Sequence, residues 1–376
     1  METLTTEALI IKPKDSVFIK DISIDKKNSF EVKTTWTVSS VCNSERRRFN
    51  LTKSHTDSNA FVGGHEAVGV IDGEHYLEKS YALLPHSNCL TRNEKIKCPA
   101  CHNNSENLCG HMRHAGLDEN TPSGFVKQMF VPKSQLYDVS EIDLEIAPFL
   151  EPLSCVIRSW EKISFDYASG VNEINIIGGG PIGCLHALYV NKLNKKNKIN
   201  IIEKNVLRRS VLKNIFMDVK TIRIIDDDSE TLSDVSVMAA SDNDAYKTTV
   251  SLTKKEGTII LFSGFDDLSF VDNNFLPEII HRNEFIHYTS NFVFVGSSGY
   301  SKQDILKAKM HLLDFGILKK LVTGKVYGLN SNIINMYDGT TETYEEPVLI
   351  KDIKGHYPQH IKIQYFNNYD DNDIHI

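Results

Sequence analysis

The sequence predicts an α/β protein in which a β-rich domain is interrupted by a domain built on a doubly wound parallel sheet. Three observations predict it: short strands with little helical periodicity before residue 150, strands that alternate with helices after it, and a glycine-rich turn between one such strand and helix. The 376 residues suffice for two domains. We expect them at 1–150 and 151–295, with a return segment over 296–376 that completes the first domain.

The first domain contains three segments with strand character. The stretch SFEVKTTWTV alternates apolar and polar residues around Phe30, Val32 and Trp36, which is typical of a half-buried strand. Further short strands are predicted at 66–71 and 124–132.

The second domain alternates short apolar runs with amphipathic segments. This order predicts a parallel sheet with right-handed crossovers. Strands are expected at 173–177, 199–204, 219–225, 234–241 and 257–265, and helices at 181–196 and 206–216. An amphipathic helix at 301–317 and a weak strand followed by an acidic tail, from 361 to 376, belong to the return segment.

Composition excludes several classes of protein. Hydrophobic residues make up 41% and charged residues 24%, which is ordinary for a globular chain. The 42 basic and 49 acidic residues give a net charge of −7, which argues against a general nucleic-acid binder. No apolar run approaches the roughly 18 to 20 residues that cross a bilayer, and METLTTEALIIKPKD does not resemble a secretory signal. We therefore expect a cytoplasmic protein with reduced cysteines and no membrane or nucleic-acid partner.

The glycine loop predicts a dinucleotide site. The run from Gly178 through Gly180, Pro181 and Ile182 to Gly183 fits G-x-G-x-x-G between a predicted strand and a predicted helix. The loop lets a pyrophosphate approach the backbone at a helix N-terminus. Glu203 lies 20 residues beyond Gly183, where a carboxylate accepts hydrogen bonds from the ribose hydroxyls of NAD and repels the 2′-phosphate of NADP. Lys204, Arg208 and Arg209 follow it and could soften that repulsion.

Four of the seven cysteines fall within 21 residues and predict a structural zinc site in a lobe at 86–112. Cys98 and Cys101 form C-x2-C, and Cys109 follows after seven residues. Cys89 is the obvious fourth ligand, although eight residues separate it from Cys98. A histidine could replace it, and four lie nearby: His86, His102, His111 and His114.

A second, dispersed set of metal-binding residue types suggests a catalytic zinc with an open position. Cys42 follows a predicted strand, His65 and Glu66 precede the next strand, and Glu151 stands where the second domain begins.

These motifs together resemble the zinc-dependent medium-chain alcohol and polyol dehydrogenases, of the sorbitol and threonine dehydrogenase kind. The resemblance extends to about residue 330, and it includes Cys42-Asn43-Ser44-Glu45, Gly64-His65-Glu66, the cysteine lobe, Glu151-Pro-Leu-Ser and the glycine loop. It implies a GroES-like catalytic domain, a Rossmann domain and two zinc ions per chain. It also implies a hydride transfer between an alcohol and the nicotinamide, and a homodimer or homotetramer.

The resemblance assigns roles to matching positions. Cys42, His65 and either Glu66 or Glu151 would hold the catalytic zinc, because these carboxylates trade places around the metal in polyol-type members. Ser44 would hydrogen-bond the reacting oxygen and pass on its proton. Glu45 stands where the family usually has Asp, and it would orient His65.

The chain departs from the family pattern at several positions. Lys95 stands where the lobe's first cysteine is expected, and Asn43 replaces a glycine. The segment before Pro85 and the last 40 residues match poorly, which affects the inferences about substrate and oligomer.

The substrate is less well defined by the sequence. A polyol, a polyol phosphate or a cyclitol is expected. Arg47 and Arg48 could grip a phosphate or carboxylate, or Arg46 to Arg48 could be a solvated basic strip. An aminocyclitol or secondary-metabolite dehydrogenase and a non-catalytic zinc-stabilised NAD-binding protein are the alternatives.

Overall fold

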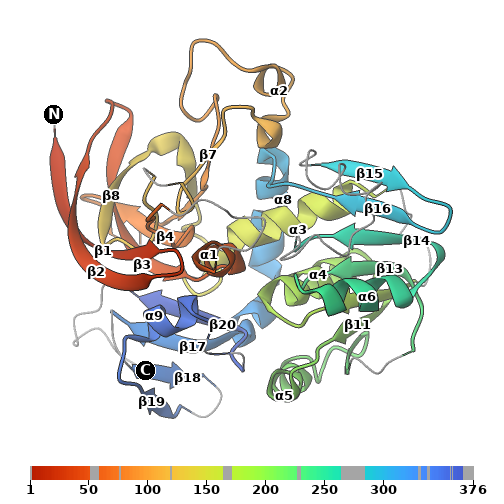
Figure 1. Ribbon diagram of the computed structural model, residues 1–376. Helices are drawn as coiled ribbons and strands as arrows, with labels where there is room; N and C mark the ends of the chain where they lie inside the picture. Colours follow the sequence, from red (N-terminus) through yellow and green to blue (C-terminus); the bar gives the residue numbers. More distant parts are fainter. Residues whose placement is uncertain are drawn as a thin grey trace.

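The computed structural model describes residues 2–50, 59–75, 78–118, 121–163, 172–226, 230–263, 284–328, 332–336, 339–355, 357 and 359–366. Two sheets lie side by side in it, and two helices run between them (Figure 1). The predicted acidic tail and the end of the strand predicted at 257–265 lie outside the described residues.

A mostly antiparallel sheet of nine strands forms the first domain, in the order β19-β18-β17-β20-β3-β4-β5-β9 with β8 also paired to β3. The return segment completes this sheet, because β20 pairs antiparallel with β3 through Gln364 and Ser40. The strands are β3 (Glu31–Ser40), β4 (Glu66–Ile71), β5 (Tyr81–Leu83), β8 (Gln128–Pro132), β9 (Leu136–Asp138), β17 (Val322–Tyr327), β18 (Asn332–Asn335), β19 (Thr341–Thr343) and β20 (Lys362–Phe366).

An N-terminal hairpin that the sequence did not predict packs on this sheet. Its strands are β1 (Thr3–Lys12) and β2 (Ser16–Asp25), and Lys14 takes a positive φ of 54° in the tight turn between them. The backbone of Ile11 exchanges hydrogen bonds with that of Phe61, and both side chains join the apolar core. The hairpin therefore holds the chain segment that leads into His65.

The second domain is a seven-stranded sheet in the order β12-β11-β10-β13-β14-β16-β15. Six strands run parallel, as expected, and β15 is antiparallel at one edge. The parallel strands are rich in buried isoleucine and valine, as is typical of a sheet with both faces covered. The strands are β10 (Glu173–Ile177), β11 (Lys198–Ile202), β12 (Ile222–Ile225), β13 (Ser233–Met238), β14 (Thr253–Leu261), β15 (Phe285–Tyr288) and β16 (Val293–Gly296). The helices are α4 (Pro181–Leu193), α5 (Val206–Ile215) and α6 (Asn243–Ser251).

Helices α3 (Leu150–Glu161) and α8 (Lys302–Asp314) lie between the two sheets (Figure 1). Leu153, Ile157 and Trp160 of α3 are fully buried in the core that the two domains share. The interdomain boundary thus passes through packed helices, and the first turn of α3 carries Glu151 into the interior.

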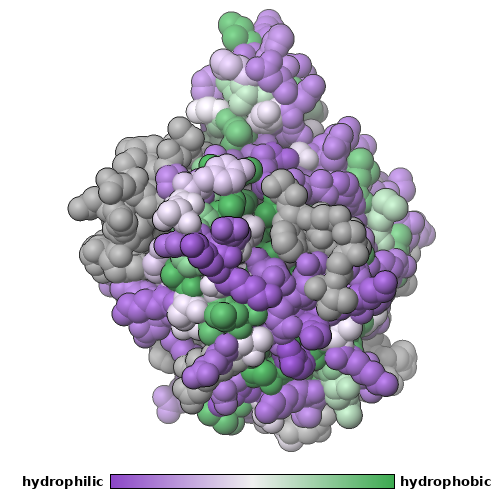
Figure 2. Space-filling view, turned by 90° about the vertical axis from the view of Figure 1, so that its right-hand side faces the viewer, coloured by the Kyte–Doolittle hydropathy of each residue, from purple (hydrophilic) through white to green (hydrophobic). Residues whose placement is uncertain are grey.

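The cysteine lobe projects from the body of the molecule, at the top of Figure 2. It extends from the short pairing of β6 (His86–Ser87) with β7 (Arg113–His114), and contains α2 (Pro99–His102). Two further short helices, α1 (Asn43–Phe49) and α9 (Val348–Ile353), contact each other, and α1 lines the interdomain cleft. Within the described residues, no helix has the length and apolar character needed to span a membrane.

Candidate active site and zinc sites

Cys42 owes its position to the start of α1. It is the N-cap residue of this helix, with an extended backbone at φ −94° and ψ 154°. Glu45, in the first turn, accepts a hydrogen bond from the Cys42 amide at 2.8 Å. This reciprocal cap satisfies a helix-end donor and holds the thiol at the end of the helix.

The same carboxylate holds His65. Its Oε1 accepts a hydrogen bond from the Gly64 amide at 2.5 Å and lies 3.0 Å from His65 Nδ1. Gly64 has φ +89°, and a Cβ there would lie 2.6 Å from the Phe125 amide nitrogen, so only glycine fits this turn. Glu45 is completely buried, and the contact with His65 implied by the resemblance is present.

Cys42, His65 and Glu66 form a compact group of possible metal ligands. One donor atom from each lies within 4.8 Å of the others, as donors to one zinc ion require. Burial alone would lower the pKa of His65, but the charges of Glu45 and Cys42 raise it well above its ordinary value. The surroundings therefore favour positive charge at this position, which suits a metal cation.

Glu66 has a buried basic partner that the sequence analysis missed. Its Oε2 accepts a hydrogen bond from Ser40 Oγ at 2.7 Å and pairs with the ammonium of Lys362 in β20. The Lys362 side chain is only 4% exposed. A lysine within the run IKIQYF was the available signal, because every residue of strand β20 is buried and a buried lysine needs a charged partner.

Glu151 lies close to this group but outside it. Burial, followed by the repulsion of Glu66, raises its pKa to about 7, against the attraction of His65 and Lys362. Its Oε1 is 3.5 Å from the thiol of Cys155. Among the described residues Glu66 is thus the carboxylate gathered with Cys42 and His65, and direct metal binding by either glutamate stays a prediction.

Three rings extend the site away from the metal ligands. The ring centroids of His65 and His114 are 5.2 Å apart, and those of His114 and His86 are 4.9 Å apart. Tyr300 stacks on His86 at 4.5 Å. His86 and His114, which the sequence offered as alternatives for the cysteine lobe, therefore face the catalytic group instead.

Several buried polar atoms of the site have no hydrogen-bond partner among the described residues. In the described part of the chain, Ser44 Oγ, His86 Nδ1 and the Tyr300 hydroxyl have none. Since buried polar groups are normally paired, these atoms are suited to the polar groups of a ligand.

The two arginines predicted to grip a substrate contact protein groups. Arg47 donates to the carbonyl of Ser263 at 2.6 Å, at the end of β14 in the other domain. The guanidinium of Arg48 lies 4.3 Å above the ring of Phe61. Their role toward a substrate stays a prediction.

The glycine loop and Glu203 line one cavity of about 330 Å³ in the interdomain cleft. Gly178 has φ +108°, and a Cβ on Gly183 would lie 1.9 Å from the Gly178 carbonyl oxygen, so the strand and α4 meet through glycine alone. Glu203 accepts a hydrogen bond from the Gly179 amide at 2.9 Å and pairs with Arg208 at 3.1 Å. Gly180, Pro181 and Ile182 also line this cavity.

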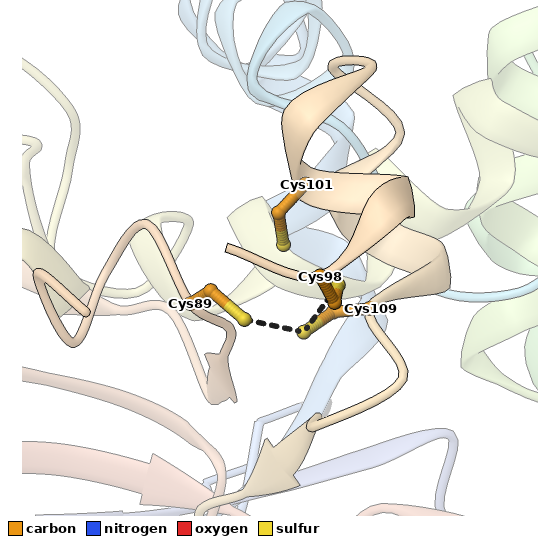
Figure 3. A group of neighbouring side chains, drawn as sticks. All are labelled: Cys89, Cys98, Cys101 and Cys109. Carbon is orange, nitrogen blue, oxygen red and sulfur yellow. Dashed lines mark hydrogen bonds between the residues drawn. The ribbon is translucent and has the colours of Figure 1, made fainter. Parts of the chain in front are cut away.

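The lobe brings its four cysteines together (Figure 3). The sulfurs of Cys89 and Cys109 are 3.5 Å apart, and those of Cys98 and Cys109 are 3.7 Å apart. Four thiolates at about 2.3 Å from one zinc ion would lie about 3.8 Å from one another. These distances fit a tetrahedral zinc site, and all four thiols are free rather than disulfide-bonded.

The long loop before Cys98 explains how Cys89 reaches the site. Asn88 Oδ1 accepts hydrogen bonds from the amides of Leu90 and Thr91, which reverses the chain directly after Cys89. The Glu94 amide then donates to the Cys89 carbonyl. His111 Nδ1 is 3.8 Å from Cys89 Sγ, at the margin of the four sulfurs.

Replacing Cys89 should remove one zinc ion. We expect Cys89→Ser to lower the zinc content by one ion per chain, with a lower thermal midpoint, because three thiolates leave the site open. Metal analysis after dialysis measures the content. The matched control, His111→Ala, should keep the wild-type zinc content. If His111→Ala instead loses an ion and Cys89→Ser keeps it, the site is Cys3His.

Removing the charge of Glu45 should weaken the catalytic site. Glu45→Gln should lower zinc affinity there about tenfold to hundredfold, since residues that orient a ligand commonly have effects of this size. Competition with a chromophoric chelator measures it. Glu31→Gln is the control, a buried glutamate on β3 that bonds the Lys27 amide instead. Equal zinc affinity in the Glu45 variant and the wild type would contradict the assignment.

Comparisons with known proteins agree with this geometry. No family model matches the chain. It is 27% identical over 135 residues to (R,R)-butanediol dehydrogenase of Saccharomyces cerevisiae, covering 32% of this chain and 34% of that one. It is 23% identical over 142 residues to L-threonine 3-dehydrogenase of Deinococcus radiodurans, covering 37% and 38%. The matches thus span about a third of the length of these curated relatives.

Solved structures match over almost the whole chain. L-idonate 5-dehydrogenase of Escherichia coli superposes with a TM-score of 0.69 at 18% identity, over 97% of this chain and 99% of that one. A zinc-binding dehydrogenase of Sinorhizobium meliloti bound to NADP gives 0.71 at 15%, over 96% and 99%. Galactitol-1-phosphate dehydrogenase of Escherichia coli gives 0.67 at 16%, over 96% and 99%. The chain therefore has the fold of the zinc-binding medium-chain dehydrogenases, and the comparisons confirm its resemblance to that family.

Proposed function

We propose that the chain is a zinc-dependent oxidoreductase that transfers a hydride between a secondary alcohol and NAD. One observation carries this proposal: α1 joins the two halves of the site. Its N-cap is Cys42 of the ligand group, and its residues Asn43 and Arg46 line the cavity of the glycine loop. A metal at Cys42 and a nicotinamide in that cavity would then share one cleft.

The residues present fit a zinc ion and a dinucleotide. Zinc at Cys42, His65 and Glu66 would supply Lewis-acid activation of an alcohol or carbonyl oxygen, and the nicotinamide would supply the hydride chemistry. Glu45 fixes the ring of His65, and Lys362 offsets part of the negative charge of Glu66. These contacts fix the donor atoms before a substrate arrives.

Two side chains of the site, Ser44 and Glu151, can transfer protons. Ser44 Oγ is buried and has no partner among the described residues, so it can donate to or accept from a substrate oxygen. Glu151 is a buried carboxyl group close to the ligand group, so it can accept or release a proton in this part of the cleft. We infer that Ser44 contacts the reacting oxygen and that Glu151 serves as a nearby proton reservoir.

The rings of His86, His114 and Tyr300, beside the ligand group, favour an uncharged, hydroxylated substrate. Burial, and then the charge of His65, lower the pKa of His86 to about 4, so this imidazole is neutral at pH 7. A neutral imidazole and a phenol offer hydrogen bonds to hydroxyl groups but no charge to a phosphate. A polyol or another alcohol with a neighbouring hydroxyl is therefore the proposed substrate. The names of the relatives, which include butanediol and idonate dehydrogenases, agree with this class.

NAD is the proposed dinucleotide. The buried carboxylate of Glu203 lines the cavity and would oppose a 2′-phosphate. Arg208 lies 3.1 Å from that carboxylate, so its charge is already partly compensated. A cytoplasmic location and a homodimeric or homotetrameric assembly stay predictions of the sequence.

The main test is the loss of Cys42. Cys42→Ala should reduce turnover to background and remove one zinc ion, while NADH binding survives, because the dinucleotide cavity is intact. Rates of NAD reduction with butanediols, hexitols, their phosphates, inositols and threonine provide the readout, and unphosphorylated diols or polyols should be preferred. Ser159→Ala is the control, because this buried serine near the other end of α3 bonds the Val156 carbonyl and no residue of the ligand group. Near-normal turnover by Cys42→Ala would refute the proposal.

The dinucleotide preference can be tested at Glu203. Glu203→Gln keeps the hydrogen-bonding shape but removes the charge, so kcat/KM for NADP relative to NAD should rise about tenfold, or ~1.4 kcal/mol. Steady-state kinetics with both dinucleotides measure the ratio. Glu173→Gln, a carboxylate paired with Arg223 outside the cavity, should leave it unchanged. A wild-type enzyme that prefers NADP would overturn the NAD assignment.

A further inference from the structure

A second group of possible metal ligands adjoins the four cysteines of the lobe. Cys89, Glu94 and His111 each place one donor atom within 4.8 Å of the others, and Cys89 also belongs to the group of four cysteines. Thiolate, carboxylate and imidazole are all ligands that zinc accepts. This second group lies at the surface, because the side chains of Glu94 and His111 are 34% and 63% exposed.

The long loop after Cys89 supplies Glu94. Eight residues separate Cys89 from Cys98, whereas the family pattern has its first cysteine at the position of Lys95. Figure 3 shows Cys89 approaching the other three sulfurs from this separate loop. The loop folds back on itself, so that the Glu94 amide donates to the Cys89 carbonyl at 2.9 Å. The departure from the family pattern thus brings a carboxylate beside a zinc ligand.

Arg92 fixes the two surface ligands relative to each other. Its Nε donates to Glu94 Oε1 at 2.6 Å, and its Nη2 donates to the His111 carbonyl at 2.9 Å. Its Nη1 donates to the carbonyl of Ser87, in strand β6 at the base of the lobe. The Arg92 side chain is itself only 14% exposed. One guanidinium therefore anchors both segments to the base of the lobe.

The donor atoms of the three side chains point toward one another. His111 Nδ1 lies 3.8 Å from Cys89 Sγ and 3.9 Å from Glu94 Oε2, while Glu94 Oε1 is the oxygen that bonds Arg92. Around one tetrahedral zinc ion, these two pairs of donors would be about 3.6 Å and about 3.4 Å apart. The His111 amide also donates to Cys109 Sγ at 3.4 Å, which keeps the ring beside the sulfurs. A small contraction would therefore let the three side chains hold an ion.

The four-cysteine site is closed to direct exchange with solvent. All four cysteines are at most 7% exposed, so an ion cannot reach their sulfurs in one step. Cys89 belongs to both groups, and its thiolate can stay bound while Glu94 and His111 replace the three deeper thiolates. Each exchange replaces one donor with another, so no electron is transferred.

We propose that Cys89, Glu94 and His111 form an outer zinc-binding group through which zinc enters and leaves the four-cysteine site; this rests on zinc in the lobe and not on the proposed hydride transfer. Glu94 and His111 bind an incoming ion together with Cys89, and the three deeper thiolates then displace them. The outer group speeds the exchange and is not part of the final site. Zinc content at equilibrium therefore should not depend on it.

The test measures the rate at which the protein gives up zinc to an excess of the chromophoric chelator pyridylazoresorcinol. Entry and exit follow the same path in opposite directions, so release reports on both. His111→Ala and Glu94→Gln should each slow release from the lobe about tenfold, which corresponds to ~1.4 kcal/mol in the transition state, and keep the wild-type zinc content. Comparison with Cys42→Ala, which should keep only the ion of the lobe, identifies the phase that comes from the lobe.

The matched control is His102→Ala, which removes an exposed histidine of the same lobe outside the outer group and should leave the release rate unchanged. Unchanged or faster release in either His111→Ala or Glu94→Gln would overturn the proposal, because side chains that only shield the sulfurs would speed release when removed. A wild-type lobe that holds no zinc would refute the zinc assignment of the lobe as well, whatever the turnover of the enzyme.

Discussion

The buried carboxylate of Glu45 is the contact on which the candidate active site depends. It caps α1 through the Cys42 amide, bonds the Gly64 amide and fixes His65, so one side chain joins two segments about 20 residues apart. Burial alone would raise the pKa of Glu45, but the charge of His65 and the bonds from His65, Cys42 and Gly64 lower it. The charged form of Glu45 is therefore stabilised. Glu45 positions Cys42 and His65, two of the proposed metal donors, and is not itself a member of the donor group.

Local sequence patterns predicted most of the fold and the donors. The glycine loop, the four lobe cysteines and each strand or helix of the second domain occupy one short segment, and Cys42 and the pair His65 and Glu66 each stand beside a predicted strand. Such segments carry their own periodicity or spacing, and the structure places them as expected. The hairpin of β1 and β2 was missed, although both strands are ten residues long, because β2 is mostly exposed and so lacks the buried apolar face that marks a half-buried strand.

The partners of these donors could not be predicted, because they come from distant segments. Lys362 reaches Glu66 across 296 residues, and Arg46 reaches Asp352 across 306. His86 and His114 carry no local sign of whether they face the lobe or the catalytic group. Their placement follows from the short pairing of β6 with β7, whose register aligns His86 with His114. Tertiary pairing, rather than residue type, decided these roles.

The position of β20 has a consequence for the order of synthesis and folding. This strand lies between β3 and β17, and its Lys362 is the buried cation beside Glu66. A nascent chain that has exposed residues up to the Rossmann domain would hold Cys42, His65 and Glu66 but not that lysine. The unpaired carboxylate would then have to stay hydrated or protonated, since an uncompensated buried charge is costly. The metal-binding pocket can therefore become dry only after β20 has been synthesised and has paired with β3, so the pocket is completed later than the segments that supply its metal donors.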